Sequence, residues 1–448
     1  MSKSKKSIFS IILLPEIIVL SGLLGGCQNL PVFFSSEPES INATEVQPQI
    51  ETVPTHQFQL ADGQNIVGDL AAIHTRTKDT LPDIARHFGL GYNDITLANP
   101  AIPPWTPASD SRVLLPLHFI LPDAPHKGIV LNLANMRLFY YTRQQQPLEV
   151  FTYPVGIGRQ GWNTPMGLTR IANKKANPNW YVPDSIHREH AEKGAALPKV
   201  VAAGPDNPLG RYAMPLSIPG YLIHGTNKPY GIGMQISHGC VQLYPEDIEE
   251  LFKKASIGMQ VRIVHQPYLA AWDKNMLFLE AHEPLPKWAR DKHRFQKQLL
   301  KHLKQISAKA KASVDWSKVK RVLQRSDGIP TPILKQSPDI AEISQNALQL
   351  AHPRQLYEQP VIEDLKANDW SMLVATFDNE TKAQQLAAML NHQGPPIPAR
   401  KIQKDESYQV IAGPYKNKKE AKAAAQRIRL DFEINVKTLK PHLISKNE

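Results

Sequence analysis

Residues 222–227 read LIHGTN and residues 236–243 read ISHGCVQL, and these two stretches decide how the rest of the chain is interpreted. Together they hold two histidines and Cys240. A thiol attacks a carbonyl only as a thiolate, and a free thiol near pH 7 is only a few per cent ionised. A nearby imidazole can take the proton and later return it to a leaving amine. The stretches indicate a cysteine nucleophile with a histidine base, although an inert buried cysteine beside a histidine gives the same pair.

Either histidine is a candidate for the base. His238 lies two residues before Cys240, and positions i and i+2 share one face of a strand. His224 ends an apolar strand expected over residues 221–223, and the proline and glycines within 229–233 permit a loop that returns to Cys240. The residues alone do not choose between the two histidines.

The two stretches and the residues around them also match a longer pattern. HGT, then SHGC followed by a branched apolar residue, is similar to the active-site pattern of the YkuD-type L,D-transpeptidases. The similarity continues through TPMG at 164–167, NPLG at 207–210 and YPEDI at 244–248. The resemblance implies an L,D-transpeptidase catalytic domain over residues 126–265. Short strands separated by turn residues favour a mostly antiparallel β fold for the same region.

The resemblance assigns a role to each matching residue. It implies that Cys240 is the nucleophile, His224 the proton donor and acceptor, and His238 a supporting group in the site. The backbone N–H groups of Gly239 and Cys240 are expected to stabilise the oxyanion, because preorganised donors best meet developing charge. Many family members carry Arg or Asn where this chain has Gln242, so a neutral amide there predicts a different substrate or acceptor preference. The residues expected to contact the substrate or to orient His224 are Gly225, Thr226, Tyr230, Ser237 and Gln242.

The implied substrate is the tetrapeptide stem of peptidoglycan. Cys240 is expected to attack the carbonyl between the third and fourth stem residues, release D-alanine and form a thioester. An amine then takes the acyl group: the side amine of a diaminopimelate in a second stem, or a lysine of an envelope protein. Two alternatives stay open, namely an L,D-carboxypeptidase or hydrolase that uses water on the same thioester, and a non-catalytic glycan-binding tether. We expect no organic cofactor and no metal, since His187 and His190 have metal-like spacing but lack further ligands.

The first residues resemble an export signal with a lipid attachment site. A lysine-rich start precedes an apolar run, and two glycines lead into Cys27, as in a bacterial lipobox. We expect residues 1–27 to be a lipoprotein signal with Cys27 acylated. Residues 28–64, rich in Ser, Pro, Glu and Gln, are expected to be a tether. By the same resemblance Gln28 favours the outer membrane, so the protein is expected in the periplasm, held to a membrane by lipid.

A small module is expected before the catalytic domain, over residues 65–118. Helices are predicted over 82–88 and 92–98, and a closing strand over 113–116. This β-α-α-β unit resembles a LysM domain, a module that binds peptidoglycan.

A second module is expected at residues 367–442. The pattern predicts a strand over 370–377, a helix that Thr381 caps and a further helix over 418–430. With QVIAGPY at 409–415, the order β-α-β-β-α-β resembles a SPOR domain. That family binds glycan strands stripped of stem peptides.

Residues 266–366 are expected to be a basic helical extension followed by a proline-punctuated linker. The chain of 448 residues is too long for one core, so a multidomain protein is expected. The formal net charge is +11, and the basic excess is concentrated over 287–325. Such a stretch contacts anionic lipid, acidic polymer or nucleic acid, or is simply a solvated helix face. Because the sequence holds no zinc-finger spacing, RRM pattern or P-loop, we expect no nucleic-acid partner.

Overall fold

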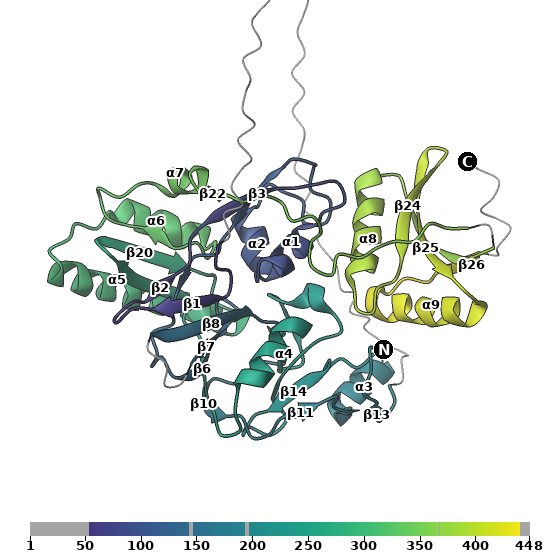
Figure 1. The fold of residues 1–448 in the computed structure, drawn as a ribbon, viewed down its shortest axis with the longest axis horizontal. Helices are drawn as coiled ribbons and strands as arrows, with labels where there is room; N and C mark the ends of the chain where they lie inside the picture. Colours follow the sequence, from purple (N-terminus) through teal and green to yellow (C-terminus); the bar gives the residue numbers. More distant parts are fainter. Residues whose placement is uncertain (1–52, 143–146, 193–196, 367, 440–448) are drawn as a thin grey trace, which may run out of the picture. The chain divides into compact units, whose positions relative to one another are not determined.

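The residues that the computed structural model describes are 53–142, 147–192, 197–366 and 368–439 (Figure 1). Cys27 and the signal and lipid site expected around it lie outside the described residues, so those expectations stay predictions. Every element given below belongs to a single unit, Gln49–Glu448, as defined by contacts between residues.

A six-stranded sheet forms the centre of the catalytic domain, in the order β1-β8-β7-β6-β18-β10 (Figure 1). Its strands are β1 (Gln57–Leu60), β6 (Gly128–Asn132), β7 (Arg137–Tyr141), β8 (Leu148–Pro154), β10 (Gly167–Arg170) and β18 (Gln260–Val264). Neighbouring strands are antiparallel, except β6 and β18, which run parallel. The mostly antiparallel β domain expected from the sequence is confirmed.

The edge strand β1 corrects the expected tether. It pairs with β8, and along it Phe58 and Leu60 are buried while Gln57 and Gln59 are exposed. This alternation is that of a strand with one face on a core. Residues 57–60 therefore belong to the folded catalytic sheet and not to a tether that continues to residue 64.

The two middle strands of the central sheet, β6 and β7, are buried on both faces. Ile129 and Leu131 of β6 pack into a core that also holds Val241, whereas Val130 between them packs into a second core with Ile84 of the N-terminal module. Because side chains alternate along a strand, one strand serves both cores. The N-terminal module and the catalytic domain thus share a continuous apolar core.

A second sheet, in the order β11-β14-β15-β17, carries the HGT stretch. Its strands are β11 (Lys175–Ala176), β14 (Tyr212–Pro215), β15 (Leu222–His224) and β17 (Val241–Gln242). The same domain holds the strand pairs β9 (Ile157–Gly158) with β16 (Gln235–Ser237) and β12 (Trp180–Tyr181) with β13 (Val200–Val201). Its helices are α3 (Asp184–Glu192), α4 (Pro245–Lys254) and the 3-10 turn η1 (Pro229–Gly231). Whereas β14 and β15 are antiparallel, the pairs β15–β17 and β9–β16 are parallel.

The N-terminal module has the expected β-α-α-β order. Its elements are β3 (Ala71–His74), α1 (Leu81–His87), α2 (Tyr92–Ala98) and β4 (Arg112–Leu115), and β3 and β4 are antiparallel. Thr80 caps α1 by accepting a hydrogen bond from the Asp83 N–H, and Pro82 lies in the first turn, where no N–H is needed. Beside this unit, β2 (Ile66–Val67) pairs with β5 (Phe119–Ile120), and β22 (Leu348–Gln349) runs parallel to β3.

Residues 266–366 are a folded region and not an extension with a linker. The expected helices are present as α5 (Lys292–Lys309) and α6 (Trp316–Arg325), flanked by η2 (Pro286–Asp291) and α7 (Ile340–Gln345). They accompany an unexpected sheet of β19 (Tyr268–Asp273), β20 (Met276–Ala281) and β21 (Thr331–Pro332). Leu279, Leu303 and Val319 are buried in the cluster that joins this sheet to the helices. The linker expectation was wrong because apolar residues between the prolines complete a core.

The C-terminal region has the expected β-α-β-β-α-β order. Its elements are β23 (Trp370–Phe377), α8 (Glu380–His392), β24 (Ala399–Lys404), β25 (Ser407–Tyr415), α9 (Lys418–Phe432) and β26 (Lys437–Leu439). The strands form one antiparallel sheet in the order β24-β25-β23-β26. Asn379, and not Thr381, caps α8, because its side chain accepts the Lys382 N–H.

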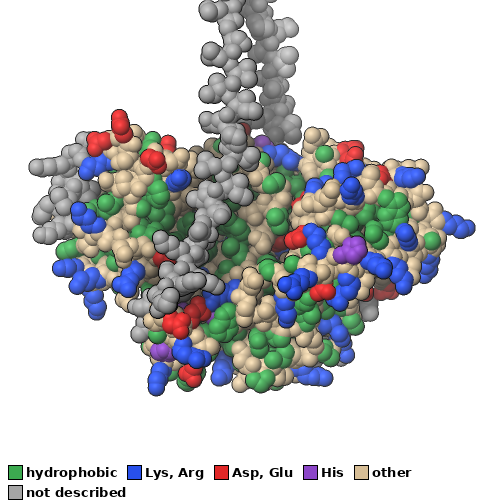
Figure 2. Space-filling model, turned by 180° about the vertical axis from the view of Figure 1, so that it is seen from behind, with side chains coloured by type: hydrophobic (Ala, Val, Ile, Leu, Met, Phe, Trp, Pro, Cys, Tyr) green, Lys and Arg blue, Asp and Glu red, His purple; other side chains and the backbone are tan. Residues whose placement is uncertain are grey.

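The surface of α5 has a charged face and an apolar face. Leu299 and Leu303 are buried, while Lys297 and Lys301 are exposed, as in a helix with one solvated face. Figure 2 shows Lys and Arg side chains spread over the face in view, with Asp and Glu side chains among them. No helix in the described part of the chain has the length and apolar character needed to cross a bilayer. An anionic partner for this region stays a prediction.

Candidate active site

Strands β15 and β17 bring the two sequence stretches together. They run in parallel, with Ile223 opposite Val241 and His224 opposite Gln242. Cys240 immediately precedes β17, two positions before Gln242. Cys240 itself lies outside the strand, and its thiol contacts the backbone of Leu222, two positions before His224 on β15. The pairing of β15 with β17 therefore brings Cys240 to the strand that carries His224.

His224 is 3% exposed, and its Nδ1 lies 2.6 Å from the carbonyl oxygen of Gly225. A carbonyl only accepts, so Nδ1 donates, and Nε2 of the neutral ring is left to accept a proton. Burial lowers the pKa of His224 to about 4, although hydrogen bonds to the backbone of Gly225 and Leu209 oppose this shift. At neutral pH His224 is an uncharged imidazole, the form that acts as a base.

The Cys240 thiol is also neutral in the resting site. Burial raises the pKa of the Cys240 thiol, and a hydrogen bond with the backbone of Leu222 offsets only part of that rise. Its Sγ lies 3.8 Å from the carbonyl oxygen of Gly220. The site therefore holds a thiol and an imidazole rather than a preformed ion pair, and the proton moves only when a substrate carbonyl is attacked.

Two hydroxyl groups fix the turn from Ser237 to Cys240. Ser237 Oγ accepts the Gly239 N–H at 3.1 Å and donates to the Cys240 carbonyl oxygen at 2.6 Å. Thr164 Oγ1 donates to the Gly239 carbonyl oxygen at 2.9 Å and accepts the Gly158 N–H at 3.1 Å. Gly239 has φ +105°, and a β-carbon there would lie 2.9 Å from the Tyr221 ring. This position therefore requires glycine.

The turn corrects two expectations. The residues between β16 and β17 are not part of a strand, so His238 and Cys240 do not share a strand face. The Gly239 N–H already donates to Ser237 Oγ, so it is not poised to bind an oxyanion. Ser237, expected to contact substrate, instead holds the turn in shape.

His238 lies in an ionic cluster beside the turn. Its Nε2 is 3.0 Å from Glu189 Oε2 and 3.0 Å from a terminal nitrogen of Arg159, and that nitrogen is 2.5 Å from the same carboxylate oxygen. Trp162 packs edge-on against the His238 ring, with the ring centroids 4.9 Å apart. Glu189 comes from α3, the helix that also carries His187 and His190.

Sequence reasoning missed Arg159 and Glu189. Neither belongs to a recognisable motif, and the contact joins the end of β9 to a helix that follows much later in the chain. The sequence does show a basic residue, Arg159, directly after β9, but only the tertiary structure shows that its partner is Glu189.

Three other predicted contact residues have local roles. Thr226 Oγ1 accepts the Lys228 N–H at 2.9 Å, so it closes a turn, whereas the Gly225 carbonyl orients His224 as expected. Gln242 pairs through its backbone with Gly156 in both directions. The buried Oε1 of its side chain has no hydrogen-bond partner within the described part of the protein.

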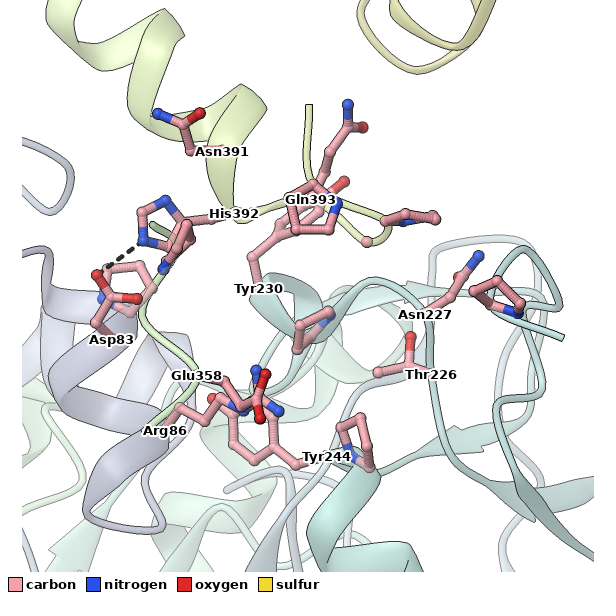
Figure 3. A pocket seen from close by; sticks show the side chains of 18 residues that line it. Asp83, Arg86, Thr226, Asn227, Tyr230, Tyr244, Glu358, Asn391, His392 and Gln393 are labelled. Atoms are coloured by element: carbon pink, nitrogen blue, oxygen red, sulfur yellow. Dashed lines mark hydrogen bonds and ion pairs between the residues drawn. The ribbon is translucent and has the colours of Figure 1, made fainter. Parts of the chain in front are cut away.

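Tyr230 lines a separate cavity of about 390 Å³ (Figure 3). The cavity is bounded by α1, by the loop after β15 and by the loop after α8, and Tyr230, Tyr244 and Arg86 project into it. At its edge His392 Nε2 lies 2.8 Å from Asp83 Oδ2. Neither Cys240 nor His224 lines this cavity, so the structure does not bring Tyr230 together with the nucleophile.

The fold and the site together define a class of protein. It is a β-rich domain in which a thiol lies directly before one strand of a parallel pair and a buried, neutral imidazole ends the other. A neutral thiol with an adjacent base is the arrangement used for acyl transfer through a thioester.

Comparison with known proteins gives the family. The model of the L,D-transpeptidase catalytic domain, YkuD, matches residues 126–263, and that of the SPOR domain matches residues 366–435. The probable L,D-transpeptidase YcfS of Escherichia coli K12 is 35% identical over 278 residues, which are 60% of this chain and 86% of that protein. The probable L,D-transpeptidase ErfK/SrfK of Salmonella typhimurium is 35% identical over 284 residues, 62% of this chain and 91% of that protein. The NMR structure of the Enterococcus faecium L,D-transpeptidase catalytic domain is 21% identical and covers 32% of this chain and 99% of that domain, with a TM-score of 0.24.

The chain belongs to the L,D-transpeptidase family. It is a peptidoglycan L,D-transpeptidase, an acyl-transferring enzyme, with a SPOR domain in its C-terminal region. The predictions of this catalytic domain and of the SPOR domain are confirmed.

Proposed function

We propose that this L,D-transpeptidase works through a Cys240 thioester, with His224 as the proton carrier. His224 Nε2 takes the thiol proton as sulfur attacks the carbonyl between the third and fourth residues of a stem tetrapeptide. His224 then returns that proton to the departing amine, so the C–N bond breaks and D-alanine leaves. The observation that supports the proposal is the parallel pairing of β15 with β17, because Cys240 stands directly before β17 and its thiol contacts the backbone of Leu222 on the strand that ends in the neutral His224.

The second half of the reaction runs the same proton path in reverse. An acceptor amine attacks the thioester and gives up a proton to His224, and Cys240 leaves as a thiol after taking that proton back. The acceptor is the side amine of diaminopimelate in a second stem, which gives a 3–3 cross-link, or a lysine of an envelope protein. Water in the same place would give the tripeptide of an L,D-carboxypeptidase.

The backbone N–H of Cys240 is the proposed donor to the oxyanion. Gly239 next to it is already engaged with Ser237 Oγ and with Thr164 Oγ1, so its own N–H is not counted. Those two contacts keep the peptide plane before Cys240 fixed, and a fixed donor stabilises developing charge without reorganisation.

The flanking parts are proposed to hold the enzyme on its polymer. The β-α-α-β order at the N-terminus supports a LysM-like module, and the SPOR domain would bind glycan strands. Acylation of Cys27 would anchor the chain to a membrane in the periplasm. Weak binding modules on one chain gain affinity through effective concentration. Sacculus pull-down of the full chain, with and without residues 367–442, tests the C-terminal module, which has a core of its own.

Incubation of the full chain with a disaccharide tetrapeptide tests the chemistry. Intact-mass analysis should show an acyl adduct on the wild type and none on Cys240→Ala. Product analysis should show free D-alanine with either a 3–3 linked dimer or a tripeptide joined to an added lysine peptide. Tripeptide without any such product overturns the transfer, and an adduct that persists in Cys240→Ala overturns the nucleophile.

A further inference from the structure

The Glu189 side chain places a carboxylate beside His238, next to the turn that carries Cys240. Glu189 Oε2 lies 2.5 Å from a terminal nitrogen of Arg159 and 3.0 Å from His238 Nε2. The pKa of Glu189 is lowered to about 2, chiefly by its hydrogen bond with Arg159 and also by that with His238. Glu189 is therefore an anion in contact with both Arg159 and His238.

This cluster is built into the same turn as the nucleophile. The Arg159 N–H donates to the Ser237 carbonyl oxygen at 2.9 Å, and a β-carbon on Gly158 would lie 3.0 Å from the α-carbon of Gly239. Trp162 closes one side of His238. An anion held by Arg159 and His238 therefore lies beside the turn that carries Cys240, where the stem peptide is processed.

The contact with Glu189 leaves part of the hydrogen-bonding capacity of Arg159 unused. A guanidinium prefers two parallel hydrogen bonds to the two oxygens of a carboxylate. Here one carboxylate oxygen, Oε2, takes the contact, and the buried Nε of Arg159 has no hydrogen-bond partner in the described part of the protein. An entering carboxylate can engage both nitrogens and so displace Glu189.

The helix that delivers Glu189 is lightly held. Along α3 the buried side chain is Ile186, while Arg188 and Glu192 are exposed. Elements with few buried apolar contacts open at low free-energy cost. Glu189 can therefore leave Arg159 without disturbing the sheet that carries His224.

We infer that Arg159 and His238 form a binding site for a carboxylate of the stem peptide, and that Glu189 fills this site until substrate arrives. The inference rests on the proposed function, because it names the group that the same site recognises. It also gives a cation to a site whose residue after Val241 is the neutral Gln242. The stem offers carboxylates on its D-glutamate, its diaminopimelate and its terminal D-alanine, and the experiment separates them.

Steady-state release of D-alanine from disaccharide tetrapeptides tests the Arg159 half. Four donors are compared: one with all carboxylates free, and three with a single carboxylate amidated. For Arg159→Met we expect KM for the free donor to rise about 10- to 100-fold with little change in kcat, as for loss of a charge-assisted contact. One amidated donor should then be used equally well by wild type and variant, which identifies the carboxylate. Arg188→Met on the exposed face of α3 is the matched control, and Arg159→Lys should fall between.

The Glu189 half predicts a change of opposite sign. Glu189→Gln removes the internal competitor, so KM for the free donor should fall several-fold, while Glu192→Gln on the same helix should leave KM unchanged. A rise in KM for Arg159→Met together with a fall in KM for Glu189→Gln cannot come from a general loosening of the site.

Two results would overturn the inference: Arg159→Met raising KM by the same factor for all four donors, or Glu189→Gln raising KM as Arg159→Met does. If wild-type protein releases no D-alanine in a Cys240-dependent way, the proposed function itself fails. If release is normal and only the discrimination is missing, the carboxylate site alone is wrong. Thermal unfolding of each variant confirms that the protein assayed is folded.

Discussion

The two histidines beside Cys240 lie in opposite surroundings. His224 ends a strand, is 3% exposed and makes its ring contact with a neutral backbone carbonyl. His238 lies in a turn, has a side chain 26% exposed and contacts a carboxylate and a guanidinium. Burial favours the neutral form of the His224 imidazole and lowers its pKa to about 4. Nearness to the nucleophile in sequence therefore does not select the base, whereas the surroundings of each histidine do.

The largest expected effect is on the buried histidine. His224→Gln removes the proton carrier while nearly keeping its volume, so acylation of Cys240 should slow by about 10²- to 10⁴-fold with KM little changed. The rate of acyl-enzyme formation from a disaccharide tetrapeptide, followed by intact mass, measures this. Near-wild-type acylation would show that His224 is not the proton carrier and would leave His238 as the candidate base.

The second prediction concerns stability, and its sign follows from the lowered pKa of His224. Above pH 6.5, folded and unfolded chains both carry a neutral His224. As pH falls from about 6.5 to about 4, the unfolded chain binds a proton that the folded chain refuses, so stability is progressively lost. At about 1.4 kcal/mol per pKa unit, the loss is about 3 kcal/mol.

Pulse proteolysis in urea at pH 7 and pH 4, read on the catalytic domain, measures that loss. The stability advantage of wild type over His224→Gln should shrink by up to about 3 kcal/mol between the two pH values. Comparison with the variant is needed because burial also lowers the pKa of His265 to about 4, and that contribution cancels in the difference. A difference that does not change with pH contradicts a neutral His224.

Local patterns predicted much of the fold. The helix expected over 92–98 and the strand expected over 370–377 appear as α2 and β23 with those bounds, because a helix period and a run of β-favouring residues are visible in a few neighbouring residues. The sheet of β19, β20 and β21 was missed, because β21 pairs with β20 across two intervening helices. β1 was missed for a different reason, since its alternation is visible at 57–60 but its partner strand lies far along the chain.

The candidate site also contains some residues that the sequence predicted and some that it did not. Cys240 and His224 were predictable, because both stand in a motif with a chemical meaning. Arg159 and Glu189 were not, since a single salt bridge between distant residues leaves no pattern in either segment. The role expected of Gly239 was wrong because a sequence does not show that Ser237 Oγ already occupies its N–H.

The third prediction tests what positions the nucleophile between the two histidines. Thr164→Val removes a buried hydroxyl that serves both Gly158 and Gly239, so two backbone groups lose their partner. We expect a loss of about 2 kcal/mol in stability and about tenfold slower acylation. Thr169→Val is the matched control, because that buried hydroxyl has no hydrogen-bond partner in the described structure, and its loss should be nearly neutral. Equal effects of the two substitutions would show that the turn does not depend on Thr164.

The smallest expected effect is on the exposed histidine. His238→Asn keeps a hydrogen-bonding group near Glu189 and Arg159 but removes the ring that Trp162 covers. Since His238 contacts charged groups and not the reacting proton, KM for the tetrapeptide should rise about three- to tenfold while kcat stays within about twofold. Measured beside His224→Gln, the two variants should separate cleanly, one in kcat and the other in KM. A collapse of kcat in His238→Asn would contradict a role confined to substrate binding and would make His238 a candidate for the base.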